Sequence, residues 1–403
     1  MLPDSNGRIM ADRTSVGRDR AFAVVVAVLV LAAGELIAFV GVTIFGAKVH
    51  PRLVWAPDVS RFEEGYGGFV SAHDTLLGWP TKGDPRHDDR GARTLPAYPD
   101  GPSCVSLYGD SFTFAAEVSD EAAWANVLAR TMGCRVANYG VGGYGTDQAF
   151  LRFLSSDPDE SELVVLGIFE DNVQRNLNRY RALLAGESEL FEFKPRFVRS
   201  DDGQLRLVSL RFPEPAEIDG FLEEPGRILQ DEYFLPGSPA GPVVPAFPFM
   251  WTAARIALHP DVRAVLRGRP YWERFYRPGH PSEGLEIMLA LVRAFQVEAS
   301  SRGQQLLVVV FPSPRTLRIV ERTNRTPYAD LIRGASESGT RIVDLSDGLL
   351  SRLSGRSPCE IATQPDACRG HYNAEGNAWV AEIVHQAASG TGLVQRRAGR
   401  SFQ

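Results

Sequence analysis

The sequence lacks several features that would point to common functional classes. It has no excess of basic residues, since 43 Lys and Arg stand against 49 Asp and Glu for a net charge of −6, and no nucleic-acid partner is expected. It has no second apolar run of membrane-spanning length, so nothing supports a transporter. Its four cysteines form no CxxC pair and no cysteine–histidine spacing typical of zinc, and we expect no metal site.

The one long apolar run lies near the N-terminus. Residues 21–46 read AFAVVVAVLVLAAGELIAFVGVTIFG, which is longer than the roughly 20 residues that cross a bilayer and than the apolar core of an ordinary signal peptide. We therefore expect an uncleaved transmembrane helix in the lipid bilayer, with cleavage near FGAKV as the alternative. Arginines are denser before the run than after it, which predicts a cytoplasmic tail at residues 1–20 and an extracytoplasmic remainder.

Glu35 lies inside this run, where an ionised carboxylate is costly. One interpretation is that Glu35 takes part in a proton relay or binds a partner helix. The other is a plain membrane anchor in which the glutamate is protonated or faces the interface. We favour the plain anchor, and thus a single-pass protein of the cell membrane.

The cysteines fit an exported chain, because an even number in an oxidising compartment indicates two disulfides. Cys104 and Cys134 each open a short apolar run, and Cys359 and Cys368 bracket a short loop. Four free buried thiols in a cytosolic protein are the alternative, which the expected topology contradicts.

The rest of the chain predicts one large α/β domain behind a linker. Residues 47–100 are rich in proline, glycine and charge without a sustained period, which is typical of a membrane-proximal linker. Over residues 101–395, short runs rich in Val, Leu and Ile alternate with helical stretches, one of them starting after Ser119. This alternation predicts a parallel sheet covered on both faces. Five strands suffice for a flavodoxin-like three-layer sandwich, preceded by one transmembrane helix.

A long insertion at about residues 180–281 interrupts the alternation. It contains RFVRSDDGQLRLV, in which Asp-Gly between two alternating runs predicts a β-hairpin. Its aromatic residues are expected to pack in a core, with a sugar-binding cleft as the alternative; they are Phe191, Phe193, Phe197, Phe247, Phe249 and Trp251.

Four polar features follow apolar runs or precede the last helix, at the expected carboxyl ends of parallel strands, where such sheets bind ligands. They are Ser111 in SLYGDSF, the glycine-rich NYGVGGYGTDQ, Asn172 in FEDN, and His371 in GHYNAEGN. A serine nucleophile needs a base to take its proton, and a histidine titrates near neutral pH. The N–H groups of Ser111 and a loop glycine, with the Asn172 amide, could stabilise an oxyanion. This combination predicts a serine hydrolase.

Each feature alone has a simpler interpretation. Gly-Asp-Ser commonly forms a turn, Asn172 could cap a helix, and His371 could be a structural histidine, as we interpret the other six. GVGGYG lacks the lysine and spacing of a P-loop and fits the dinucleotide fingerprint poorly, so no cofactor is expected. The order and placement of the four features together favour catalysis.

Together the motifs resemble the SGNH, or GDSL-type, hydrolase superfamily. GDSF, NYGVGGYG, FEDN and HYNAEGN match four of its sequence blocks. The resemblance implies that Ser111 is the nucleophile and first oxyanion donor, that Gly143 and Asn172 are the other donors, and that His371 is the base. The flanking LGW…RGAR and GYGTDQ resemble a membrane-anchored branch related to polysaccharide O-acetyl esterases and transferases.

Two positions depart from the family pattern. Val173 follows Asn172 where the family often has an aspartate, and Cys368 stands where the family places the aspartate three residues before the histidine. Asp366 could orient His371 if a Cys359–Cys368 bridge folds the loop back. A backbone carbonyl in a Ser–His dyad is the alternative.

The resemblance implies a membrane-tethered, extracytoplasmic enzyme that cleaves or transfers an acyl group, acetyl above all. Its substrate would be an acylated carbohydrate or another small ester, and the intermediate an acyl-Ser111. The alternative is a catalytically silent binding or scaffold domain in envelope polysaccharide assembly.

Overall fold

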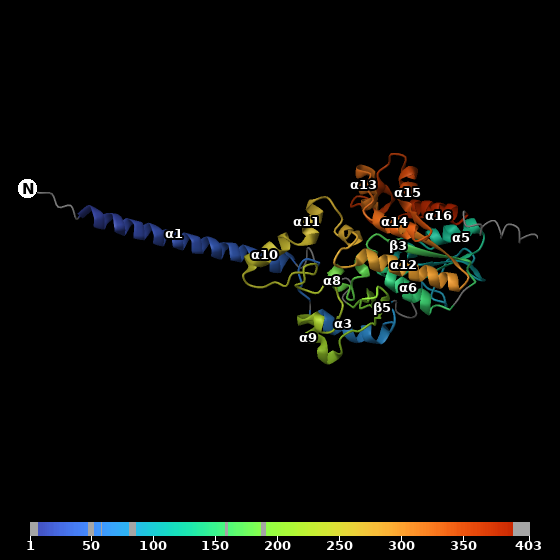
Figure 1. Cartoon of the computed structure of the whole chain (residues 1–403), viewed down its shortest axis with the longest axis horizontal. Coiled ribbons are helices and arrows are strands. Elements are labelled where there is room, and N and C mark those ends of the chain that lie inside the picture. Colours follow the sequence, from blue (N-terminus) through green and yellow to red (C-terminus); the bar gives the residue numbers. More distant parts are fainter. Residues whose placement is uncertain are drawn as a thin grey trace, which may run out of the picture.

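A computed structural model describes residues 7–46, 52–57, 59–79, 86–157, 160–186 and 191–389. The first part of the expected tail, pieces of the expected linker and the end of the expected domain, 390–395, lie outside the described residues. Figure 1 shows a long N-terminal helix that leads into a sheet layered between helices.

Five parallel strands form the central sheet in the order β2-β1-β3-β6-β7. Their bounds are β1 Ser103–Tyr108, β2 Arg135–Asn138, β3 Leu163–Phe169, β6 Gln305–Phe311 and β7 Ile342–Asp344. Counted along the chain these are strands 1 to 5 in the spatial order 2-1-3-4-5, which is the flavodoxin-like order. The predicted fold class is confirmed.

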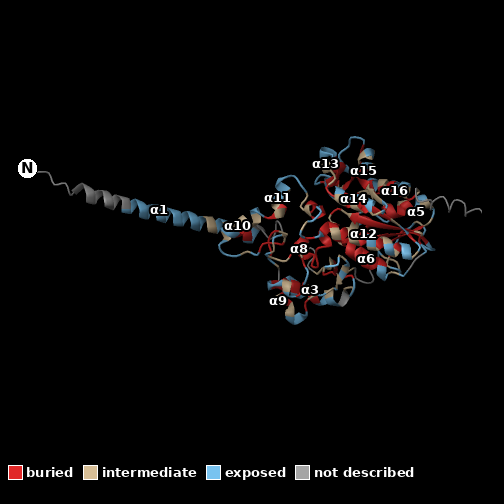
Figure 2. Cartoon of the chain, viewed as in Figure 1, coloured by how far each residue is buried: buried red, intermediate tan, exposed pale blue. Residues whose placement is uncertain are grey.

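Helices cover both faces of the sheet, because successive strand residues point to opposite sides. Leu166 and Val308 face a core shared with α6 Thr146–Ser155, α12 Gly284–Ser301 and α14 Ala329–Glu337. Val165 and Val309 face a second core built with α5 Trp124–Met132, α13 Pro314–Thr323, α15 Leu345–Leu353 and α16 Ala374–Ser389. Figure 2 shows these strands and inner helix faces as the buried part of the chain.

One helix starts later than the sequence suggests. The stretch after Ser119 forms a turn, and α5 begins at Trp124. A tertiary bond from Arg93 to Asp120 and a local bond from the Asn126 side chain to the Glu121 carbonyl hold this turn in a non-helical form. Such bonds are invisible in a helical pattern.

The insertion consists of short elements. They are α8 Ala182–Ala185, β4 Arg196–Arg199, β5 Leu205–Val208, η3 Pro215–Glu217, α9 Ile218–Glu223, η4 Pro225–Arg227, α10 Phe249–Ala257, α11 Pro260–Leu266 and η5 Glu273–Tyr276. β4 and β5 pair antiparallel, which confirms the predicted hairpin. Phe193 and Phe197 are core residues as expected, whereas Phe247 and Trp251 are exposed.

Part of the expected linker packs onto the insertion. Helix α3, Val59–Ala72, buries Phe62 and Tyr66 in the same core as Phe193 and Phe221. These aromatic rings contact one another at centroid distances of 5.3 to 6.4 Å. Helix α3 therefore shares a core with the domain.

The N-terminal helix α1, Gly7–Val40, continues into a π-helical segment, Gly41–Gly46. Its Gly17–Ile44 stretch is long and apolar enough to cross a membrane, properties that a signal sequence shares. Both disulfides join the expected cysteines, Cys104 to Cys134 and Cys359 to Cys368.

Glu170 ties the end of the sheet to α13. Its carboxylate accepts the Ser313 backbone N–H at 2.9 Å and the hydroxyls of Ser313 and Thr316 at 2.7 and 2.8 Å. Burial raises the pKa of Glu170 to about 8, against the lowering effect of these hydrogen bonds. The folded state thus favours the neutral acid.

We expect Glu170→Gln to change how stability depends on pH. The pKa of Glu170 is higher in the folded state than its ordinary value of 4.5. The contribution of Glu170 to stability is therefore complete below pH 4.5 and is lost as pH rises toward about 8. The amide stays neutral, so wild type should lose stability relative to the variant by up to about 1.4 kcal/mol per pH unit in that window. Denaturant unfolding from pH 5 to 8 measures this difference. Glu321→Gln, on the exposed side of α13, is the control, and parallel curves for wild type and Glu170→Gln would contradict the prediction.

Candidate active site

Ser111 begins a one-turn helix directly after the first strand. This helix, α4, runs from Ser111 to Phe114, and Asp110 caps it by accepting the Phe112 N–H at 2.8 Å. The turn before it is tight: a Cβ on Gly109 would stand 2.1 Å from Thr113 Oγ1 and 2.6 Å from the Gly167 carbonyl oxygen. Glycine at 109 therefore lets the chain leave the sheet with Ser111 at its end, half-exposed.

The other oxygen of Asp110 connects this turn to the third strand. Asp110 Oδ2 accepts the Phe169 N–H at 2.9 Å and the Asn172 side-chain amide at 2.7 Å. Asn172 opens α7, Asn172–Arg175, and is fully buried. A side-chain amide has two N–H groups, and the contact with Asp110 uses one of them.

The glycine-rich loop lies against the same turn. Val141 donates its N–H to the Gly109 carbonyl at 3.1 Å, and the Asn138 side chain donates to the Thr113 carbonyl at 2.9 Å. Gly143 has φ +78, a conformation that favours glycine. Trp79, from the LGW motif, donates its indole N–H to the Gly142 carbonyl at 2.8 Å.

His371 reaches this end of the sheet from a small hairpin. After η6, Pro358–Ile361, strands β8, Ala362–Gln364, and β9, Arg369–Tyr372, pair antiparallel. The imidazole lies on the Phe112 ring, with centroids 4.6 Å apart. Because Phe112 follows Ser111, the structure brings the expected base and nucleophile into one neighbourhood.

Glu117 is the carboxylate beside the imidazole, and sequence reasoning missed it. Its Oε1 lies 2.9 Å from His371 Nδ1, and its Oε2 accepts the His371 backbone N–H at 3.2 Å and the Thr363 hydroxyl. Oε1 lies off the direction of a ring N–H bond, so the contact is close without being an aligned hydrogen bond. Free enzymes often show such loose catalytic contacts.

Asp366 lies elsewhere. It is exposed in the turn between β8 and β9, and in the described part of the chain no hydrogen bond or ion pair joins it to His371. The disulfide folds that turn back through Cys368, but the carboxylate beside Nδ1 comes from Glu117. Nothing in the local sequence FAAEVSD marks Glu117, since only the three-dimensional approach of the β8–β9 hairpin to α4 brings it to the imidazole.

The pKa of Glu117 is lowered. Burial acts to raise it, but the hydrogen bonds from Thr363 and His371 outweigh burial. The carboxylate is therefore ionised over the neutral range.

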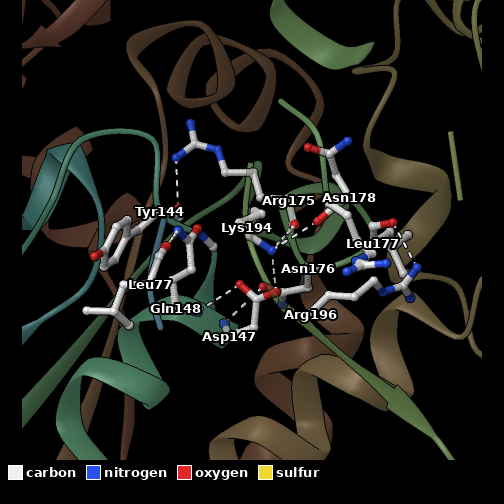
Figure 3. A network of polar contacts seen from close by, with 12 residues as sticks. Leu77, Tyr144, Asp147, Gln148, Arg175, Asn176, Leu177, Asn178, Lys194 and Arg196 are labelled. Atoms are coloured by element: carbon white, nitrogen blue, oxygen red, sulfur yellow. Dashed lines mark hydrogen bonds and ion pairs between the residues drawn. The ribbon is translucent and has the colours of Figure 1, made fainter. Parts of the chain in front are cut away.

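Buried charges fix the insertion onto these loops (Figure 3). Lys194, fully buried, donates to Asp147 at 2.5 Å and to the carbonyls of Arg175 and Asn178 at 3.1 and 3.0 Å. Burial lowers the pKa of Lys194 to about 8, although Asp147 acts to raise it. Asp147 follows the glycine-rich loop and Arg175 ends α7, so one side chain of the insertion holds both candidate oxyanion segments.

The sequence matches no protein-family model and no curated protein. Solved structures similar to it include a G-D-S-L family protein from Desulfitobacterium hafniense DCB-2, with 12% identity, a TM-score of 0.33, and coverage of 70% of this chain and 98% of that one. Another is LAE5, an alpha/beta hydrolase enzyme from the metagenome of Lake Arreo, Spain, with 12% identity, a TM-score of 0.35, and coverage of 73% and 96%. Likenesses this distant carry no argument about activity, which must come from the site itself.

We expect Glu117→Gln to lower kcat on the order of 100-fold with little change in KM, because the imidazole loses the carboxylate that orients it. The lowered pKa of Glu117 sets the pH window: the effect is fully present above the ordinary value of 4.5 and is lost as pH falls through the lower folded value. The ratio of wild-type to variant rates should therefore be constant from pH 5 to 8 and shrink only in more acidic buffer. Rates of ester hydrolysis by wild type and Glu117→Gln, measured from pH 5 to 8 and in more acidic buffer, test this prediction.

Asp366→Asn is the matched control, since it removes the carboxylate that the sequence suggested for the same role. It should retain wild-type kinetics. A large loss in Asp366→Asn with none in Glu117→Gln would reverse the assignment.

Proposed function

We propose that the chain is a membrane-tethered, extracytoplasmic serine esterase of SGNH type. It cleaves or transfers an acyl group, above all acetyl, on a carbohydrate through an acyl-Ser111 intermediate. One observation carries the proposal: the buried Asp110 carboxylate joins the Ser111 turn to Asn172, while the adjacent Phe112 packs on an imidazole that contacts Glu117. Nucleophile, base and amide donor thus come from three separate segments to one end of the sheet.

The chemistry follows from these positions. Ser111 Oγ attacks the ester carbonyl carbon while His371 takes the hydroxyl proton, and the Glu117 carboxylate stabilises the resulting imidazolium. The negative charge that develops on the carbonyl oxygen is met by the N–H groups of Ser111 and Gly143 and by the remaining Asn172 N–H. As the tetrahedral species collapses, the alcohol leaves with the proton from His371, and the acyl group stays on Ser111.

The second half-reaction decides between two products. Water attacking the acyl-Ser111 carbonyl releases the free acid, whereas a sugar hydroxyl gives a new ester. In both cases His371 accepts the proton of the attacking group and returns it to Ser111 Oγ as the bond between Oγ and the acyl carbon breaks. The alternative of a silent scaffold domain depended on Cys368 standing at the expected aspartate position. Glu117 beside His371 Nδ1 supplies a carboxylate in place of the expected aspartate, which weakens the case for a silent domain.

Covalent labelling tests the nucleophile. Full-length protein in detergent should react with an active-serine phosphonate probe and hydrolyse p-nitrophenyl acetate, because Ser111 is half-exposed beside a base. Ser111→Ala should lose labelling and at least about 1000-fold in kcat. Ser119→Ala, an exposed serine in the following turn, should behave as wild type. Unlabelled wild type, or full activity in Ser111→Ala, would refute the proposal.

A product assay separates hydrolysis from transfer. The enzyme is incubated with an acetyl donor and a glycan acceptor, and products are followed in time by mass spectrometry. Ester formation on the glycan assigns transfer, and acetate alone assigns hydrolysis. Both products should disappear in Ser111→Ala, since both pass through the same intermediate.

A further inference from the structure

The carboxylate of Glu35, within the apolar helix α1, caps helix α10 of the insertion. Glu35 Oε2 accepts the Phe249 N–H at 2.6 Å, and Oε1 accepts the Met250 N–H at 3.3 Å. The N-cap residue Pro248 offers no side-chain cap of its own. Glu35 therefore supplies the acceptors that the first N–H groups of a helix otherwise lack.

Close packing supports this contact. The rings of Phe39 and Phe249 meet edge to face, with centroids 4.9 Å apart. A Cβ on Gly34 would stand 2.9 Å from the sulfur of Met250, so glycine lets α10 approach. Figure 1 shows α10 beside the end of α1 that leads into the domain, and the two helices are in contact.

The inner face of α10 joins a small separate core at the exit of α1. Ala253 and Ile256 pack there on Val42, Leu53 and Val54. Residues 53–55 and 243 are also joined by backbone hydrogen bonds of 2.9 and 3.0 Å. The helix α1 is thus fastened to the insertion by packing and hydrogen bonds.

The outer surface of this region is apolar and uncovered. Exposed fractions are 42% for Val244, 76% for Phe247, 44% for Met250 and 63% for both Trp251 and Leu258. Helix α10, which carries Met250 and Trp251, contacts α1, and α1 has exposed apolar residues of its own, such as Leu36 and Ile37. Exposed large apolar side chains gathered on one short segment indicate a partner. Tryptophan is also one of the residues enriched at membrane–water interfaces.

The position of Glu35 gives the depth of the patch. From Arg20 to Glu35 the helix rises about 22 Å at about 1.5 Å per residue, whereas the hydrocarbon core is about 30 Å thick. With Arg20 at the inner boundary, the carboxylate lies roughly 8 Å below the outer one. Interfacial helices bury their apolar faces about 5–10 Å deep.

We propose that residues 244–251, together with Leu258, insert into the outer leaflet of the bilayer that α1 spans. This segment, the membrane foot, holds the domain against the lipid surface in a fixed orientation. The proposal rests on α1 remaining as a membrane span and is independent of the esterase activity. Its physical basis is mutual compensation: Glu35 satisfies the N–H groups of α10, and the positive end of the α10 dipole offsets the Glu35 charge.

Tryptophan quenching in membranes tests insertion. The full-length chain, with its six tryptophans, is reconstituted into phosphatidylcholine vesicles with and without bromine on the acyl chains. Brominated lipid should quench part of the emission, and Trp251→Phe should remove most of that quenching, because Trp251 is the tryptophan on the foot. Trp379→Phe, which changes a partly buried tryptophan on α16, is the matched control and should leave the quenching unchanged.

The opposite results overturn the proposal. If lipid quenching persists in Trp251→Phe, Trp251 is not the tryptophan that lies in the lipid. If aqueous iodide quenches the emission of Trp251 as strongly as that of a free indole, the membrane foot lies in water. Release of the chain from vesicles by alkaline carbonate also overturns it, since α1 would then not be a span. Phosphonate labelling of Ser111 in the same samples reports separately on the proposed function.

The role of Glu35 has its own variant. Glu35→Ala should reduce the Trp251 quenching and increase hydrogen exchange at the Phe249 and Met250 amides, because α10 loses its cap. Thr43→Ala changes a polar side chain of the π-helical segment that follows α1, whose hydroxyl donates to the Phe39 carbonyl, and should alter neither. Unchanged quenching and exchange in Glu35→Ala would show that Glu35 does not hold the foot.

Discussion

The candidate site depends on the buried carboxylate of Asp110. A carboxylate without water is tolerated only when its oxygens are hydrogen-bonded, and Asp110 satisfies this with donors from three places: Phe112, Phe169 and Asn172. The turn of Ser111, the end of β3 and the start of α7 are therefore fixed relative to one another by one side chain. Removing it would leave three donors, two of them buried, without this acceptor, which explains why Ser111 and Asn172 can be positioned together.

Two further polar contacts extend this arrangement outward. Lys194 fastens the insertion to Asp147 and to the carbonyls that follow α7. Arg93, from the RGAR motif, donates to the Ala115 carbonyl at 2.7 Å, just after α4. The segments before and after the sheet strands are thus parts of the support of the site. Phe62, in a region whose composition is typical of a linker, is buried against Phe193 and Phe221 of the insertion.

The sequence predicts features that depend on local pattern. Buried strands made of Val, Leu and Ile, the Asp-Gly hairpin, and the pairing of Cys359 with the nearby Cys368 all have signals within a few residues. Glu117 has none, because its role arises only where the β8–β9 hairpin meets the residues after α4. The prediction of the start of α5 is wrong for the same reason, because the tertiary bond from Arg93 to Asp120 outweighs the helical pattern. In each case the missing information is a contact between segments distant in sequence.

The partner of Glu35 is also a contact that the sequence alone does not predict. Taken alone, a glutamate in an apolar run indicates a plain anchor or a partner helix within the membrane, and the sequence contains no second span. The structure supplies a partner of another kind, a nine-residue helix more than 200 positions later whose first N–H groups bind the carboxylate. Two groups that would each be costly near lipid become tolerable as a pair. An exposed tryptophan and phenylalanine beside this pair are costly in water and favourable in a leaflet. The same burial of apolar surface that builds the core therefore favours holding this face against the membrane.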